Sequence, residues 1–330
     1  MCEAPSQRSP AARSVVLGIG DDAAAWQPSR SHLSVITSDA LVDGVHFVTG
    51  SMDARSIGHR AMAANLSDIA AMGARPVLAT VVLGVAAATT QEWMLEAYRG
   101  MAALAAEHRT RIVGGDIVRM PAASLSLTLV GEVARTRLKT RSGGRPGDVL
   151  AVTGPLGASR AGLELTLRPR DLDAAAQGAA LAAFATPRPR VREGRWLAAS
   201  TYVHAMMDLS DGLSTDGGRL ARASGCGAEI GELPIAPAAR SVALAAGDDP
   251  HRYALDGGED FELLIAAAPR AFAHLAGAYA KHFGRPLFAI GRLTAEPGLR
   301  SIDPLERREL VAAGWDHFTS ETGTARSRPS

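Results

Sequence analysis

The stretch MMDLSDGLSTDGGRLARAS, residues 206–224, contains an apolar segment, an acidic turn and a helical pattern in direct succession. A strand that ends in a turn and leads into a helix is a basic unit of α/β folds. The turn carries Asp208 at the strand end and Asp211 three residues later. The stretch therefore favours an α/β fold and raises the question of what these carboxylates hold.

Similar aspartate-bearing turns occur elsewhere in the chain. They are GIGDDAAAW (18–26), TSDALVDGVHF (37–47), NLSDIAAMGA (65–74) and GGDI (114–117). Aspartate is a favoured N-cap and turn residue, so each turn taken alone has a purely structural explanation. The recurrence of the pattern is what calls for a common function.

Strand and helix signals alternate along the chain. An expected strand in HLSVITSD ends at Asp39 and places three side chains on one face, namely Leu33, Val35 and Thr37. A helix is expected around residues 56–73, with Asp68 off its apolar stripe and free to face a cleft. These patterns predict an α/β fold throughout.

Glycine and proline cluster in SGGRPGD, residues 142–148, which is the best candidate for a linker. We therefore expect two domains, an N-terminal one over 15–142 and a C-terminal one over 148–318. The polar ends are expected to be a mobile N-terminus, 1–14, and a disordered tail, 319–330.

Composition narrows the function classes. The chain has 330 residues, 47% of them hydrophobic, and a net charge of +1, so no global field recruits nucleic acid or an anionic membrane. The longest apolar run, 77–88, is too short to span a bilayer. Cys2 and Cys226 are too far apart in sequence to suggest a disulfide framework, and no signal-peptide pattern is present. We expect a cytoplasmic protein.

Six aspartates lie at or next to the ends of apolar elements: Asp22, Asp39, Asp68, Asp116, Asp208 and Asp211. If their turns share a cleft, the carboxylates repel one another unless cations are bound. Mg²⁺ prefers oxygen ligands, waters and phosphates, whereas the scattered histidines show no zinc spacing. This chemistry suggests phosphoryl transfer.

The usual nucleotide-binding motifs are absent from the sequence. There is no GxxxxGK[ST], no GxGxxG opening a helix and no kinase HRD–DFG set. Only two lysines occur, Lys139 and Lys281. A nucleotide would have to be held by metal ions, backbone N–H groups in glycine turns, and arginine.

Eight segments resemble, in order, the signatures of the thiamine-monophosphate kinase family: GIGDDAA, SDALVDGVHF, NLSDIAAMGARP, GGDIVR, TRSGGRPGD, MDLSDGLSTD, GGEDFEL and GWDHF. The resemblance covers roughly residues 16–318. It implies a two-domain fold like that of aminoimidazole ribonucleotide synthetase, with mixed sheets flanked by helices. It also implies a homodimer in which the N-terminal sheet forms a barrel-like interface.

The resemblance further implies an activity and a set of site residues. ATP and thiamine monophosphate would give thiamine diphosphate and ADP, assisted by several Mg²⁺ ions. The implied metal ligands are Asp22, Thr37, Ser38, Asp39, Asp68, Asp116, Asp208 and Asp211, of which Asp208 and Asp211 are also assigned to catalysis. The implied nucleotide contacts are Gly115, Asp116, Arg141 and Ser210. The implied substrate contacts are His46, Glu259 and Trp315.

Each contact residue has a structural alternative: His46 as a packed histidine beside Phe47, Glu259 as part of a solvated turn, Arg141 as a linker charge, and Trp315 as a core anchor. The whole chain also has two alternative functions. One is a sister enzyme that makes an aminoimidazole or a selenophosphate. The other is a non-catalytic nucleotide- or metal-binding regulator.

The implied reaction needs no general base, because its acceptor is a phosphate oxygen that is already ionised at neutral pH. The barrier is the repulsion between two phosphate groups, which metal ions would offset while aligning them for in-line transfer. We therefore expect direct transfer without a phosphorylated enzyme.

Overall fold

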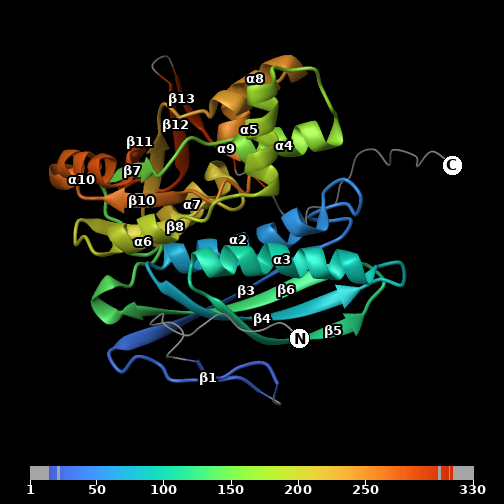
Figure 1. The fold of residues 1–330 in the computed structure, drawn as a ribbon. Coiled ribbons are helices and arrows are strands. Elements are labelled where there is room, and N and C mark those ends of the chain that lie inside the picture. The colour runs from blue at the N-terminus through green and yellow to red at the C-terminus, as the bar shows by residue number, and fades with distance from the viewer. Residues whose placement is uncertain (1–14, 21–22, 304–305, 312, 315–330) are drawn as a thin grey trace.

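The computed structural model describes residues 15–20, 23–303, 306–311 and 313–314. The expected mobile N-terminus, 1–14, and the expected tail, 319–330, lie outside these residues. Within them, two sheets lie on either side of a central helix layer (Figure 1). No helix of the described part has the length and apolar character needed to cross a bilayer.

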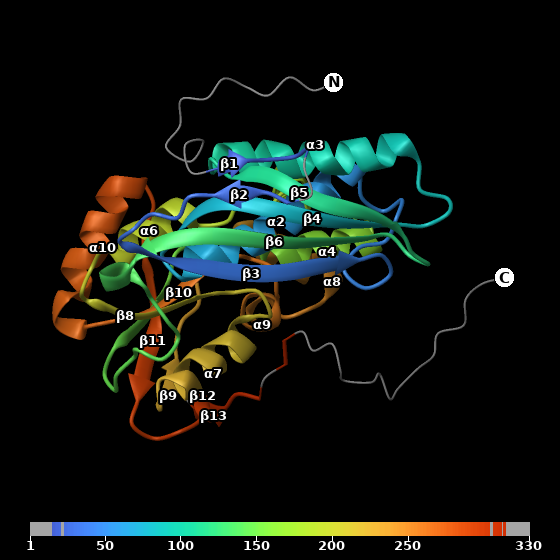
Figure 2. The same ribbon diagram turned by 90° about the horizontal axis from the view of Figure 1, so that it is seen from below.

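The first sheet contains four strands in the order β3-β6-β4-β5, and only the β4–β5 pair is parallel. Its strands are β3 (His32–Val42), β4 (Arg75–Val85), β5 (Arg111–Arg119) and β6 (Ser124–Ala134). One face is covered by α2 (Ala54–Ala71) and α3 (Gln91–Glu107), as Figures 1 and 2 show. Part of the other face packs against a hairpin of β1 (Val15–Leu17) and β2 (Ala25–Trp26).

The second sheet is mixed, as expected. Its order is β13-β12-β9-β11-β7-β10-β8, and all neighbours are antiparallel except β9 and β12. The strands are β7 (Val149–Val152), β8 (Val203–Asp208), β9 (Gly227–Ile230), β10 (Leu263–Ala267), β11 (Phe288–Thr294), β12 (Leu299–Asp303) and β13 (Glu306–Glu309).

Helices flank this second sheet, and a 3₁₀ turn, η1 (Arg135–Arg137), follows the first. The helices are α4 (Ala158–Leu167), α5 (Ala174–Ala185), α6 (Val191–Ala198), α7 (Leu213–Ala223), α8 (Pro237–Ala246), α9 (Pro250–Asp256) and α10 (Pro269–Phe283). The stretch 206–224 thus forms β8, a turn and α7, as its pattern predicts.

Helix α2 begins and ends close to the expected positions, for local reasons. The side chain of Asp53 caps its first turn by accepting the amide of Ser56 at 2.8 Å. At the other end, Gly73 has a φ of 68°, and a Cβ there would lie 2.3 Å from that of Ala198. Only glycine fits this turn without strain, so the helix ends before it.

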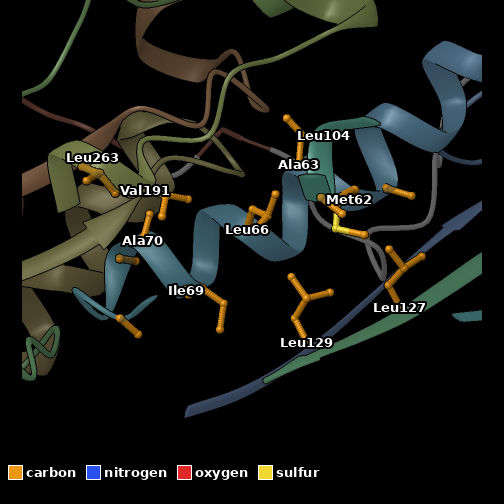
Figure 3. Close-up of a cluster of buried hydrophobic side chains, with 14 of the residues drawn as sticks. Met62, Ala63, Leu66, Ile69, Ala70, Leu104, Leu127, Leu129, Val191 and Leu263 are labelled. Carbon is orange, nitrogen blue, oxygen red and sulfur yellow. The ribbon is translucent and has the colours of Figure 1, made fainter. Parts of the chain in front are cut away.

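Helix α2 lies between the two sheets and is buried on both sides. Figure 3 shows Leu66 and Ile69 near Leu127 and Leu129 of the first sheet, with Val191 and Leu263 on the other side of the helix. This buried cluster contains residues from both sides of the expected linker, residues 142–148. The division of the chain into two domains at that linker stays a prediction.

The contact between α2 and α3 is unusually close. A Cβ on Gly58 would lie 1.9 Å from the carbonyl oxygen of Ala97, and one on Gly100 would lie 1.9 Å from that of Arg55. The two glycines therefore allow the helix backbones to touch, which fixes α2 against its neighbour.

The first sheet is open in this chain, with β3 and β5 at its edges. The described residues of the single chain therefore contain no closed barrel. The face of this sheet that the helices leave uncovered exposes apolar side chains, since Ile36 is 65% exposed and Val82 43%. Ile117, 58% exposed, lies on the edge strand β5 and pairs with Leu83 on the helix-covered side.

Candidate active site

Four of the six predicted aspartates lie together where α2 meets both sheets. We call Asp39, Asp68, Asp208 and Asp211 the junction cluster. Asp39 comes from β3, Asp68 from α2, Asp208 from the end of β8, and Asp211 from the turn before α7. Repulsion from Asp68 acts on both Asp39 and Asp208, and repulsion from Asp211 acts on Asp39. Distant parts of the chain thus bring these carboxylates into electrostatic contact.

The alternation of β3 decides which side chains join the cluster. The hydroxyl of Thr37 donates to Asp68, and the amide of Asp39 donates to the side-chain oxygen of Asn65 at 3.2 Å. Ser38 points to the opposite face of the sheet, where its hydroxyl donates to the carbonyl of Leu127 at 3.0 Å. Thr37 therefore adds an oxygen beside the cluster, whereas the Ser38 hydroxyl does not.

The carboxyl groups of the cluster are difficult to ionise together. Burial, followed by repulsion from Asp68, raises the pKa of Asp208 to about 7, although the Ser67 hydroxyl donates to it at 2.7 Å. Desolvation and then Asp68 raise the pKa of Asp39 to about 6. Desolvation also raises the pKa of Asp68 itself. The cluster therefore lacks sufficient compensating positive charge.

The Asp211 turn is held by a residue that sequence reasoning missed. Asp216, fully buried on α7, accepts the amides of Ser210 at 3.0 Å and Asp211 at 2.9 Å. Arg219 then pairs with both Asp211 and Asp216. The second aspartate of LSDGLSTD, Asp216, was the available signal, because a carboxylate near a helix start often binds turn amides.

Arg141, a predicted nucleotide contact, lies within electrostatic reach of the junction cluster. Its charge opposes the rise in pKa at both Asp68 and Asp208. The backbone of the linker is fixed because the hydroxyl of Ser224 donates to the carbonyl of Arg141 at 2.7 Å. The exposed guanidinium is therefore placed where an anion bound at the cluster could reach it.

His46, Glu259 and Ser210 are connected through Arg60, which sequence reasoning also missed. Arg60 is 2% exposed and donates to both carboxylate oxygens of Glu259, at 2.7 and 2.6 Å. It also donates to the carbonyl of His46 at 3.0 Å and lies 4.2 Å from the ring centroid of Phe184. An arginine inside the apolar stretch GHRAMAANL was the only signal for it.

The loop that carries Glu259 has an unusual backbone. Glu259 has a φ of 61°, and its amide donates to the carbonyl of Ser210 at 2.8 Å. The amide of Val42 donates to Nδ1 of His46 at 3.1 Å, which assigns the proton of the neutral ring to Nε2. Both predicted substrate residues are therefore held by specific hydrogen bonds.

Gly115 and Asp116 lie apart from the junction cluster. In the register of the sheet, Asp39 faces Leu127, Leu127 faces Val81, and Val81 faces Gly115. Three strand spacings separate Asp39 from Gly115, about 14 Å. A Cβ on Gly115, whose φ is 152°, would lie 1.8 Å from the carbonyl oxygen of Val81, so this position requires glycine.

The exposed Asp116 lines a hollow of about 540 Å³. Gly20 and Ala23, on either side of residues 21–22, line the same hollow. The predicted ligand Asp22 and the predicted substrate residue Trp315 lie outside the described residues. Gly20 and Ala23 therefore lie near the GGD turn at the β5 edge.

The junction cluster offers only oxygen ligands, and its carboxylates repel one another, so its chemistry fits a hard divalent cation. The described residues contain no group of three or more His, Cys, Asp or Glu side chains already gathered as a metal site. In this structure three of its carboxylates are bonded to other side chains: Asp68 to Thr37, Asp208 to Ser67 and Asp211 to Arg219.

The chain is similar to known proteins along most of its length. It matches the AIR synthase related proteins, with the N-terminal domain over 20–133 and the C-terminal domain over 145–304. Thiamine-monophosphate kinase of Synechococcus elongatus is 36% identical over 308 residues, 91% of each chain.

Two solved structures extend this similarity to the fold. Thiamine-monophosphate kinase from Stenotrophomonas maltophilia is 36% identical with a TM-score of 0.80, covering 87% of this chain and 91% of that one. AaThiL complexed with AMPPCP and TMP is 29% identical with a TM-score of 0.77, covering 88% and 89%. By sequence and by fold, the chain belongs to the thiamine-monophosphate kinase family.

Proposed function

We propose that the chain transfers the terminal phosphoryl group of ATP to thiamine monophosphate, giving thiamine diphosphate and ADP. The observation that carries this proposal is the junction cluster, in a chain 36% identical to a thiamine-monophosphate kinase over 91% of its length. The AaThiL complex with AMPPCP and TMP supports the same pair of ligands, because AMPPCP is an analogue of ATP.

The junction cluster is the proposed site of Mg²⁺, with Thr37 as a further oxygen ligand. The bound cations would offset repulsion between donor and acceptor phosphates, about 4 kcal/mol for each pair of unit charges ~4 Å apart at an effective dielectric of roughly 20. Asp208 and Asp211 are also proposed to act in catalysis. Asp22, Ser38 and Asp116 stay predicted ligands.

The remaining side chains bind and orient the substrates. Arg141 and Ser210 are proposed to contact the nucleotide together with Gly115 and Asp116. His46 and Glu259 are proposed to contact thiamine monophosphate, as is Trp315. Arg60 holds Glu259 and the His46 carbonyl in place, and Asp216 holds the Ser210–Asp211 turn. The acceptor oxygen is already ionised, so no side chain has to remove a proton.

The exposed apolar face of the first sheet supports a homodimer. Ile36 and Val82 are exposed on this face, and a second copy would cover them in the proposed barrel-like interface. Because ATP is a cytoplasmic metabolite, we place the reaction in the cytoplasm. Sedimentation of the wild type and of Ile36→Glu would test the interface, and an unchanged mass for the variant would contradict it.

The activity is tested with purified protein, ATP, Mg²⁺ and thiamine monophosphate, and thiamine diphosphate is the measured product. Free thiamine should not be phosphorylated, because its hydroxyl needs a base and the carboxylates of the junction cluster are proposed to be bound to Mg²⁺. Excess EDTA should abolish turnover. A phosphorylated protein trapped with labelled ATP alone would contradict direct transfer, and no thiamine diphosphate at all would contradict the assignment.

A further inference from the structure

A second hollow, about 390 Å³ in volume, lies far from the junction cluster. We call it the arginine pocket and define it by six of its lining residues: Arg75, Arg137, Arg192, Arg195, Trp196 and His282. It lies between η1, α6 and the end of α10, and α6 and α10 gather on one side of the molecule in both views (Figures 1 and 2). His32 also lines it and is seven residues from Asp39 on β3, roughly 23 Å away.

The positive charge of this pocket is not balanced by the protein. Glu132 is the single carboxylate among the lining residues, and its oxygens already accept hydrogen bonds from other groups. It accepts the hydroxyl of Ser29 at 2.6 Å, the amide of Ser29 at 3.1 Å and the guanidinium of Arg75 at 2.9 Å. Burial raises its pKa, but these three bonds outweigh that effect and lower it below the usual value.

The other arginines of the pocket have no carboxylate partner. Within the described part of the chain, Arg137, Arg192 and Arg195 form no ion pair. Glu193, the nearest acid on α6, pairs instead with Arg285 at 3.1 Å. Three guanidinium groups are therefore available to an incoming anion.

The arginines also repel one another. Burial, followed by repulsion from Arg75, Arg137 and Arg109, lowers the pKa of Arg195. Holding like charges around a concave surface costs free energy, which a bound anion would recover. Guanidinium groups suit this role because their planar forks match phosphate oxygens.

One wall of the pocket is aromatic. Trp196 stacks on His282 with ring centroids 5.9 Å apart and planes inclined by 22°, and Tyr279 and Phe283 pack against its edge. His282 is exposed, so part of this wall is accessible. A flat ring would find a matching surface beside the three cations.

We propose that the arginine pocket binds a phosphate-bearing organic anion the size of a nucleotide. Its phosphates lie on Arg137, Arg192 and Arg195, and its ring lies against the Trp196–His282 wall. The volume lies within the range of small-molecule sites, about 300–1,000 Å³. This site is separate from the junction cluster and needs no metal ion.

The test is calorimetric titration of the full chain with ADP and with inorganic pyrophosphate, both in excess EDTA. Without divalent cations the junction cluster is negatively charged and repels phosphates, whereas the arginine pocket does not. The wild type should bind ADP one to one. Arg192→Ala combined with Arg195→Ala should raise the Kd at least about tenfold.

The matched control is Arg252→Ala combined with Arg270→Ala, which removes the same charge from exposed positions outside the pocket. Its Kd should equal that of the wild type. Absence of ADP binding in EDTA overturns the proposal, as does an equal loss of affinity in both double variants. Kinase activity with Mg²⁺ is measured separately, so this failure leaves the proposed function untouched.

The role of the ring is tested by a second comparison. ADP should bind at least about tenfold more tightly than pyrophosphate, and His282→Ala should narrow this ratio without unfolding the exposed helix end. Equal affinities of the two probes for the wild type would overturn the aromatic part of the site.

Discussion

The junction cluster and the arginine pocket lie toward opposite ends of β3 and carry opposite charge. In the first, burial and then repulsion from Asp68 raise the pKa of Asp208 to about 7 and that of Asp39 to about 6. In the second, burial and then repulsion from neighbouring arginines lower the pKa of Arg195. In both places the fold keeps like charges close without enough partners. The comparison teaches that the buried core around α2 stabilises the fold, whereas the two charged sites toward the ends of β3 remain available to ligands.

The largest effect is expected from breaking the junction cluster. Asp208→Asn should reduce kcat at least about a hundredfold, or ~2.7 kcal/mol in the barrier, because one proposed metal ligand loses its charge. The melting temperature in EDTA should stay the same or rise, since a buried repelling carboxylate is removed. Product formation and thermal melting measure the two effects, with exposed Asp171→Asn as control.

A variant that melts earlier and keeps full turnover would reverse this assignment. It would mean that Asp208 serves packing rather than phosphoryl transfer.

Arg60 should affect both stability and substrate binding. Arg60→Ala leaves Glu259 and the His46 carbonyl without their buried donor, which should cost about 2 kcal/mol of unfolding free energy because Glu259 keeps some contact with water. Arg60→Lys retains the charge but not the fork, and should raise the KM for thiamine monophosphate about tenfold with little change in kcat.

Denaturant unfolding and steady-state kinetics measure these changes, and Arg55→Lys, exposed on the same helix, is the control. If Arg60→Lys behaves like wild type in KM, the guanidinium does not position the substrate loop.

The pH dependence of stability should distinguish a metal-free from a metal-bound junction cluster. Because the folded pKa values of Asp39 and Asp208 lie above those of unfolded aspartate, their protonated forms favour the folded state. Their contribution is full below about pH 4 and is lost as the pH rises through about 6 to 7. Mg²⁺ should therefore raise the melting temperature more at pH 8 than at pH 5.

Melting curves with Mg²⁺ or EDTA at both pH values provide the measurement. An equal Mg²⁺ effect at pH 5 and pH 8 would place the cation elsewhere.

The smallest effects are expected in the arginine pocket without ligand. Arg195→Ala should change the unfolding free energy by less than about 0.5 kcal/mol, because lost repulsion offsets lost packing. Arg75→Ala removes the partner of buried Glu132 and should cost about 1–2 kcal/mol. Denaturant titrations of the two variants measure the difference, and the reverse order would show that the unpaired arginines stabilise the fold.

The sequence predicted the parts of this site that follow from local patterns. Period-two alternation places Thr37 and Asp39 on one face of β3, and the apolar stripe of α2 leaves Asp68 free. The same alternation would have excluded the hydroxyl of Ser38, which points to the other face. Asp208 and Asp211 lie at a strand end and before a helix start, as their pattern predicts. The expected strand end at Asp39 was wrong, because β3 continues to Val42, and Asp68 lies near the end of α2.

Other features depend on pairings that one sequence does not contain. The 14 Å between Asp39 and Gly115 follows from the strand order β3-β6-β4-β5, which no local pattern specifies. Arg60 meets Glu259 across 199 residues of sequence. The arginine pocket likewise combines β4, η1 and α6, whose arginines look like ordinary surface charges when read along the chain.

The glycine crossing of α2 and α3 has a consequence for movement during turnover. Backbones that touch at Gly58 and Gly100 cannot slide past each other without collision. The first sheet and its two helices must therefore travel as one block. Any closure that excludes water from the phosphates has to come from the segments facing that block, such as the Asp211 turn and the loop of Glu259, or from another subunit.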